Sequence, residues 1–197
     1  MNVLILGRTK MSGSFRCIGG ISIENGRAVR LISQQGRWDT SAPFQIGQIW
    51  EISASPVANI YNPHTEDIIV NGQRLVSTCK NLAHEIRKSN ILHGGIDLLF
   101  NKNIKFTNSG SGYIDNTSLT FSTTFWKPDQ NLTLRATGTH YDYPGHFQTK
   151  GLKYVGEPAP VSVIPAGIPV RVSLARWWSP DSSTTPYRCY AQLSGWF

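Results

Sequence analysis

The sequence predicts an all-β protein, made of two small barrels in tandem with one central α-helix. Three observations favour this fold class. Charged residues make up only 16% of the 197 residues, below the roughly 25% of a typical domain, which argues against long solvated helices. The chain holds 18 Gly and 11 Pro, as expected for many short strands and turns. Stretches that alternate apolar and polar residues recur on both sides of a single helical stripe.

The N-terminal part contains four expected strands, at residues 3–6, 15–23, 27–33 and 48–54. Asn25-Gly26 separates the second strand from the third. This pair predicts a tight type I′ turn, because both of its central positions need positive φ. Such a turn would place Ile21 opposite Arg30. A second Asn-Gly pair, Asn71-Gly72, predicts another hairpin within residues 67–76.

Residues 78–90 form the one expected helix. Thr78 can cap it, and Leu82 and Ile86 belong to an apolar stripe at helical spacing. Residues 101–118 are rich in Asn, Ser and Gly, so we expect a long loop or an inter-domain linker there. The strand pattern then resumes at residues 119–121, 132–136, 153–155, 168–174 and 188–193.

This order of elements divides the chain into two units. Residues 1–100, including the helix at 78–90, are expected to form the first barrel. Residues 101–118 would be the loop or linker, and residues 119–197 the second barrel. An OB-type barrel is built from five strands and often carries a helix before its fourth strand, so both barrels are expected to be OB-like.

Charge and composition exclude several classes of protein. The formal net charge is +7 and is spread along the chain, so it would act on a partner through a folded face. No apolar run of about 18 residues predicts a membrane span, and the N-terminus lacks a signal-peptide pattern. The three cysteines, Cys17, Cys79 and Cys189, are far apart and odd in number. They predict structural thiols in a reducing, cytoplasmic setting.

Three stretches near the two ends of the chain resemble sequences of a known family. These are residues 3–10, residues 20–32 and residues 188–197, the last reading RCYAQLSGWF. They resemble a bacterial family described as dual OB-containing domains. The resemblance implies nucleic-acid binding by analogy of fold, and a place in bacterial anti-phage systems as a sensor or adaptor. It carries no catalytic motif, and residues 55–118 match nothing.

Basic residues of the N-terminal strands are candidates for contacting phosphates. They are Arg8, Lys10, Arg16, Arg27 and Arg30. The second and third strands of an OB barrel form the groove where oligonucleotides bind. Guanidinium groups there can contact phosphates or stack on bases. The alternatives are a solvated loop after the first strand, a cross-strand pair between Arg27 and Glu24, and an ordinary edge charge at Arg30.

Aromatic residues with basic neighbours are candidates for stacking on bases, which is worth about 1–3 kcal/mol per base. At expected loop positions these are Trp38, Trp126 with Lys127, and Trp177 and Trp178 with Arg176. The alternative for the adjacent tryptophans is one ring in the core and one exposed, which still leaves a ring available to a ligand.

Residues for catalysis are scarce. His140, Asp142 and His146 have the residue types of metal ligands but no recognised spacing. The stretch at residues 7–13 lacks the glycine spacing of a phosphate loop, and no Gly-x-Ser-x-Gly elbow exists. We therefore expect no catalytic residue, no metal and no cofactor.

The sequence as a whole indicates a non-catalytic protein that binds single-stranded DNA or RNA, with a defence-system effector protein as a further possible partner. Two alternatives stay open. One is a protein–protein adaptor that uses the same barrel faces, and the other is a metal-dependent hydrolase around His140 and His146.

Overall fold

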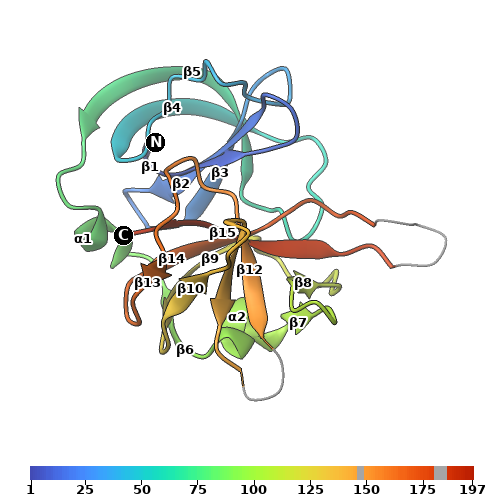
Figure 1. Cartoon of the computed structure of the whole chain (residues 1–197). Coiled ribbons are helices and arrows are strands. Elements are labelled where there is room, and N and C mark those ends of the chain that lie inside the picture. Colours follow the sequence, from blue (N-terminus) through green and yellow to red (C-terminus); the bar gives the residue numbers. More distant parts are fainter. Residues whose placement is uncertain (146–148, 180–185) are drawn as a thin grey trace.

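The structure, a computed structural model, describes residues 1–145, 149–179 and 186–197. Its first unit is a closed five-stranded barrel (Figure 1). The strands are β1 (Asn2–Lys10), β2 (Arg16–Ser22), β3 (Ala28–Ile32), β4 (Gln48–Pro56) and β5 (Asp67–Thr78). They follow the order β1-β2-β3-β5-β4, with β3 and β5 parallel and the other pairs antiparallel. The all-β prediction is confirmed.

Strand β1 is buried on both faces, which explains its continuous apolar run. Val3 and Ile5 point into the barrel core. Leu4 and Leu6 point outward and pack against Ile86 and Phe125 in a separate apolar cluster. Each such leucine stabilises the fold by about 2 kcal/mol through the area it removes from water. The first barrel is therefore fastened to the rest of the chain through its own first strand.

Two predictions made from the Asn-Gly pairs of this barrel are wrong. Asn25-Gly26 does lie between β2 and β3, but the pairing matches Gly19 with Arg30, so Ile21 does not face that arginine. Asn71-Gly72 makes no turn, because both residues lie inside the long strand β5, which pairs with β4 along its length. Tertiary pairing here overrides the preference of the Asn-Gly pair for a turn.

The helix is shorter than the apolar stripe predicts. It is α1 (Leu82–Ile86), and the side chain of Asn81, rather than that of Thr78, caps it by accepting from the His84 N–H. Thr78 is instead the last residue of β5. Ile86 is fully buried, so this short helix covers the outer face of β1.

The remaining strands form a second, curled sheet below the barrel in Figure 1, ordered β13-β10-β11-β12-β15-β14-β9-β6. Their bounds are β6 (Ile91–Gly94), β9 (Thr123–Pro128), β10 (Leu132–Leu134), β11 (His140–Tyr143), β12 (Lys150–Tyr154), β13 (Val163–Ile164), β14 (Val170–Leu174) and β15 (Cys189–Trp196). Strand β15 also lies against β1, so the two units share a seam.

Residues 101–118, expected as a long loop or an inter-domain linker, pair with strands of the second unit. They contain β7 (Lys105–Phe106) and β8 (Gly112–Ile114), and β8 pairs with β15. A 3₁₀ turn (Ile96–Leu98) and α2 (Leu99–Lys102) come just before. Ile104 and Ile114 are buried in the same core as Trp126 and Leu193. The Asn, Ser and Gly residues here serve turns between short strands, and the few apolar side chains anchor the segment. Among the described residues, no helix is long and apolar enough to cross a membrane.

Candidate functional site

A basic cleft of about 440 Å³ lies at the seam between the two units. Its walls come from the end of β1, from β2 and β3, from the loop around Trp38, and from β14. Six basic residues line it, namely Lys10, Arg16, Arg30, Arg37, Arg171 and Arg176, and no acidic residue is among the described residues that do so. We call this cavity the basic cleft.

Five residues predicted from the sequence meet in the basic cleft: Lys10, Arg16, Arg30, Trp38 and Arg176. They come from strands and loops far apart in the chain, and only the closure of the barrel against β14 brings them together. Sequence reasoning missed Arg37 as a ligand contact, and it missed Arg171 altogether. A signal for Arg171 did exist, since it is the one charged residue of its strand and lies between two valines.

Asp67 forms ion pairs with two of the arginines that line the cleft. One of its carboxylate oxygens accepts from Arg30 Nε at 2.5 Å, and the other accepts from Arg176 Nη2 at 2.5 Å. The Asp67 side chain is only 5% exposed. One carboxylate therefore serves two guanidinium groups, and the cluster keeps an excess positive charge. Arg30 is neither an edge charge nor a free one.

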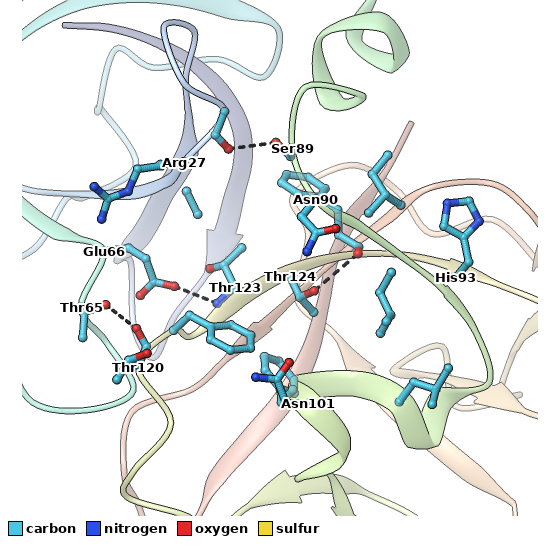
Figure 2. Close-up of a pocket in the computed structure, with 18 residues that line it drawn as sticks. Arg27, Thr65, Glu66, Ser89, Asn90, His93, Asn101, Thr120, Thr123 and Thr124 are labelled. Carbon is cyan, nitrogen blue, oxygen red and sulfur yellow. Dashed lines mark hydrogen bonds between the residues drawn. The ribbon is translucent and has the colours of Figure 1, made fainter.

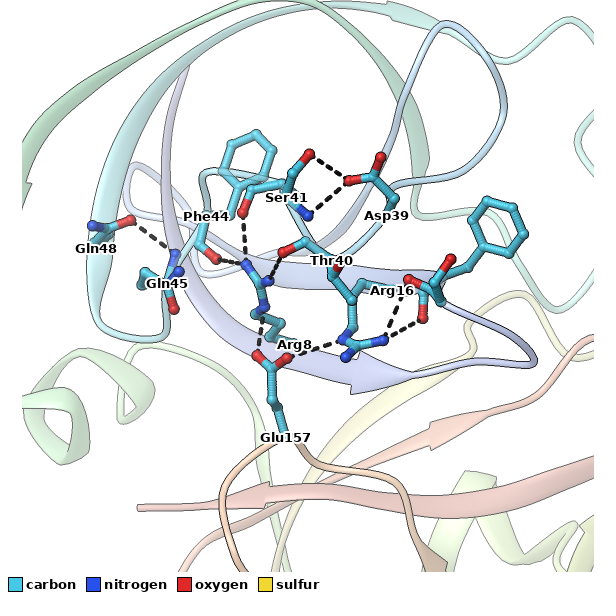
Figure 3. Close-up of polar contacts among 12 residues, drawn as sticks. Arg8, Arg16, Asp39, Thr40, Ser41, Phe44, Gln45, Gln48 and Glu157 are labelled. Atoms are coloured by element: carbon cyan, nitrogen blue, oxygen red, sulfur yellow. Dashed lines mark hydrogen bonds and ion pairs between the residues drawn. The ribbon is translucent and has the colours of Figure 1, made fainter.

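Glu157 binds a third cleft arginine, Arg16, together with the buried Arg8, as Figure 3 shows. It forms ion pairs with both Arg8 and Arg16. The Arg8 guanidinium also donates to the backbone carbonyls of Thr40, Ala42 and Phe44 at 2.7–2.8 Å. Arg8 is only 5% exposed, so the phosphate contact expected for it from the sequence is wrong. Its donors hold the loop at residues 40–44 instead.

Trp38 is half-buried against the barrel core. Its Nε1 donates to the Leu31 carbonyl at 2.8 Å, and its ring meets Phe44 edge-on at a centroid distance of 5.0 Å. The backbones of Trp38 and Arg16 form an isolated β-bridge. The ring is therefore fixed beside the cleft arginines, as a stacking surface requires, because little conformational freedom would be lost on binding.

Of the two adjacent tryptophans, one packs on the core and the other is exposed, which is the alternative given for them in the sequence analysis. Trp177 packs on the core of the second unit, and its Nε1 donates to the Asn62 carbonyl at 2.7 Å. Trp178 is 54% exposed. Its ring lies 6.0 Å from that of Tyr190, which in turn lies 6.2 Å from Tyr113. The guanidinium of Arg188 covers Tyr113 at 4.2 Å. We call Trp178, Tyr190, Tyr113 and Arg188 the aromatic strip.

Trp126 does not lie in a loop. It is a fully buried residue of β9, and its Nε1 donates to the Gly94 carbonyl at 2.8 Å. The prediction that it offers a stacking ring is therefore wrong, since its faces pack in the core. Lys127 is half-buried in the same strand and lies outside the basic cleft.

A second cavity, of about 610 Å³, contains the last predicted residue, Arg27 (Figure 2). Arg27 is exposed there, and Glu24 accepts from Ser22 and from the Asn2 N–H. Glu66 also lines this cavity, but the backbone N–H groups of Ser122 and Thr123 occupy its carboxylate. The lining thus mixes charges of both signs and favours no single class of ligand.

The metal hypothesis has little support from the residues that can be placed. His146 lies outside the described residues. Asp142 accepts from Arg135 Nε at 2.6 Å, and burial lowers the pKa of His140. Within residues 1–145, 149–179 and 186–197, no three His, Cys, Asp or Glu side chains group as metal ligands do.

A buried His–Cys pair lies behind the cleft without being activated. Cys189 Sγ is 3.9 Å from His64 Nε2. Burial, followed by the charges of Arg30 and Arg176, lowers the pKa of His64 to about 3. Burial raises the pKa of the Cys189 thiol to about 12. At neutral pH both groups are therefore neutral, and this thiol is a poor nucleophile because the thiolate is the reactive form.

The fold and the cleft together define a protein with two OB-like units and a cationic site at their seam. The model of the dual OB-containing domain family matches residues 1–196. The chain therefore belongs to this family, and the resemblance seen in its terminal strings is confirmed. Searches of curated proteins and of solved structures find no significant match.

Proposed function

We propose that this protein binds single-stranded nucleic acid without catalysis, with the basic cleft as the main contact. The observation that carries the proposal is the cleft itself. Six cationic side chains converge there from both units, with no acidic residue among its described lining. The phosphate backbone dominates nucleic-acid affinity, and lysine and arginine supply the matching charge.

The aromatic strip supports a single-stranded ligand. Trp178 presents an exposed ring, and Tyr190 and Tyr113 continue the surface with Arg188 over its end. Proteins that bind single strands combine a basic groove with such rings, because unpaired bases stack on them. Arg176, which lines the cleft, is two residues from Trp178. A role as sensor or adaptor in bacterial antiviral defence is part of the proposal through the family resemblance alone.

The experiment is fluorescence anisotropy with labelled single-stranded DNA, single-stranded RNA and duplex probes across a salt series. Lys10→Ala and Arg37→Ala each remove one exposed cleft cation. Each is expected to weaken binding several-fold for every sequence and to reduce the salt slope by about one. Lys80→Ala, an exposed lysine outside the cleft, is the matched control and should bind like the unaltered protein. Absence of binding even at low salt would refute the proposal.

A protein–protein adaptor is the second candidate, and the edge of β5 favours it. Within the described part of the chain, only residues 67–69 of β5 pair with β3, and the rest of the strand pairs with β4 alone. Leu75 and Val76 are 46% and 49% exposed there. Open edges with apolar side chains accept a further strand. Salt separates the two functions, because phosphate binding weakens steeply with salt and an apolar edge contact does not.

A further inference from the structure

One buried arginine at the basic cleft has no carboxylate partner among the described residues. Arg171, in β14, is 3% exposed. Its Nη1 donates to Ser194 Oγ at 2.8 Å and its Nη2 to Thr123 Oγ1 at 3.3 Å, and both are neutral hydroxyls. Its Nε has no hydrogen-bond partner among the described residues, and no ion pair found among them includes Arg171. Folded proteins rarely bury a charge in this way, because desolvation is costly.

Arg30 adds a second unpartnered donor to the same cleft. Its side chain is 12% exposed and its Nε is bound to Asp67, but its Nη2 has no partner among the described residues. Asp67 also neutralises Arg176. The Glu66 carboxylate also acts on both Arg30 and Arg171. Arg30, Arg176 and Arg171 against Asp67 and Glu66 leave an excess of one positive charge in the inner part of the cleft. Lys10 and Arg37 line the outer part and form no ion pair among the described residues, so the cleft as a whole stays strongly positive.

The barrel leaves space for the Arg171 guanidinium. Gly7 and Gly19 pair with each other across β1 and β2. A Cβ at either glycine would collide with the Arg171 guanidinium, most severely at Gly19. Gly19 is also the strand partner of Arg30. Two glycines therefore allow a cation from the second unit to lie beside a cation of the first, which places like charges together at an energetic cost.

We propose that the basic cleft binds a phosphate monoester, carried either by the end of a nucleic-acid strand or by a free nucleotide. A phosphate monoester carries close to two negative charges at neutral pH and three strong acceptor oxygens. These match the excess positive charge of the cleft and the guanidinium donors that lack partners among the described residues. An internal phosphodiester offers one charge and fewer free oxygens, so the cleft is better matched to a terminal phosphate.

The rest of the cleft suits a nucleoside. Its volume of about 440 Å³ is in the range of small-molecule sites. Trp38, Leu31 and Leu174 line it beside the arginines. For strand ends this inference rests on the proposed function, whereas for free nucleotides it is independent of strand binding.

The test compares ligands that differ only in the phosphate. Short labelled DNA and RNA strands with a 5′-phosphate, a 3′-phosphate or hydroxyl ends are titrated by anisotropy, and AMP and adenosine are titrated by calorimetry. We expect one phosphorylated end to bind at least about tenfold tighter than the hydroxyl strand, and AMP to bind where adenosine does not, because hydrogen bonds between charged groups are the strong ones. The full chain is used throughout.

The variant Arg171→Met should abolish the preference for the phosphorylated strand over the hydroxyl strand. The readout is the ratio of these two affinities, so a general loss of strand affinity from removing one cleft cation does not affect the test. Gly19→Ala displaces the guanidinium and should reduce the same preference, which keeps the test open if Arg171→Met fails to fold. Arg27→Met, at the second cavity, is the matched control and should behave like the unaltered protein. Thermal unfolding checks that each variant is folded.

The outcomes separate the two proposals. Binding of AMP without binding of any strand supports the phosphate site and refutes the proposed function. Strand binding with no preference for either phosphorylated end, and no preference for AMP over adenosine, overturns the phosphate site and leaves the proposed function intact. A preference that persists in folded Arg171→Met and Gly19→Ala variants also overturns it.

Discussion

Arg8 in the first barrel and Glu157 in the second unit form an ion pair across the seam, with 2.5 Å between Arg8 Nε and Glu157 Oε2. The Arg8 side chain is 6% exposed and that of Glu157 is 33% exposed. Because Glu157 also pairs with Arg16, one carboxylate joins a buried arginine to a cleft arginine. The stability of the seam and the shape of the basic cleft thus depend on the same side chain.

Replacing Glu157 should therefore cost stability. Glu157→Gln leaves Arg8 buried without a counter-charge, and we expect the free energy of unfolding to fall by about 2 kcal/mol, less than for a fully buried pair because solvent reaches the carboxylate. Glu51→Gln is the control, since its pair with Arg74 is 52% and 74% exposed. It should change stability by less than about 0.5 kcal/mol. Equal effects in urea unfolding would contradict the role given to Glu157.

Stability should also fall in mild acid through His64. Its pKa is about 3 in the folded protein against an ordinary 6.5. Between these values the unfolded chain binds more protons, so the free energy of unfolding falls as the pH drops below 6.5. From pH 7 to pH 5 the loss from this group is about 2 kcal/mol. Well above pH 6.5 the group is neutral in both states and its effect on stability disappears.

The measurement is urea unfolding at pH 5 and pH 7 for the unaltered protein and for His64→Gln. The variant cannot titrate at this position, so its stability should differ less between the two pH values, whatever its absolute stability. Parallel pH profiles for the two proteins would show that His64 is not the buried neutral group described.

The three thiols should react at different rates. Cys189 is fully buried and its pKa is raised to about 12, whereas Cys17 and Cys79 are partly exposed. We expect iodoacetamide to label Cys17 and Cys79 in the native protein, and Cys189 only after denaturation. Cys17 lines the basic cleft and Cys79 does not. A bound strand or nucleotide should therefore slow the labelling of Cys17 alone.

Peptide mass spectrometry gives the labelling of each cysteine separately. Cys79 is the internal control for any general effect of the ligand. Equal protection of Cys17 and Cys79, or rapid labelling of Cys189 in the native protein, would place the ligand or the thiol elsewhere.

Much of the fold could be predicted from local patterns. The alternation of residues located most strands, because a half-buried strand needs one apolar face, and low charge with many glycines indicated an all-β protein. The predictions were wrong where the pairing of strands distant in sequence decides the structure. Asn71-Gly72 lies inside β5, and residues 101–118 fold into the second unit. Neither result is encoded in the residues next to them.

The candidate site divides in the same way. Residue type and the expected strand or loop position identified Lys10, Arg16, Arg30, Trp38 and Arg176, because cations and aromatic rings are what nucleic acids require. The structure then excludes Arg8 and Trp126 as ligand contacts, because both are buried. Each donates to backbone carbonyls that it reaches only in the folded chain.

The composition and the periodicity of the sequence alone predicted an all-β protein with a cationic face. Both properties can be read directly from the order of the residues. The position of that face, and the charges on it that lack partners, depended on contacts distant in sequence. Arg171 and Arg30 come close because the Arg171 side chain extends from β14 to Gly7 and Gly19, and Gly19 is the strand partner of Arg30. Asp67 is shared because β5 returns beside β3. Such pairings are set by packing over the whole molecule, which no local pattern of residues records.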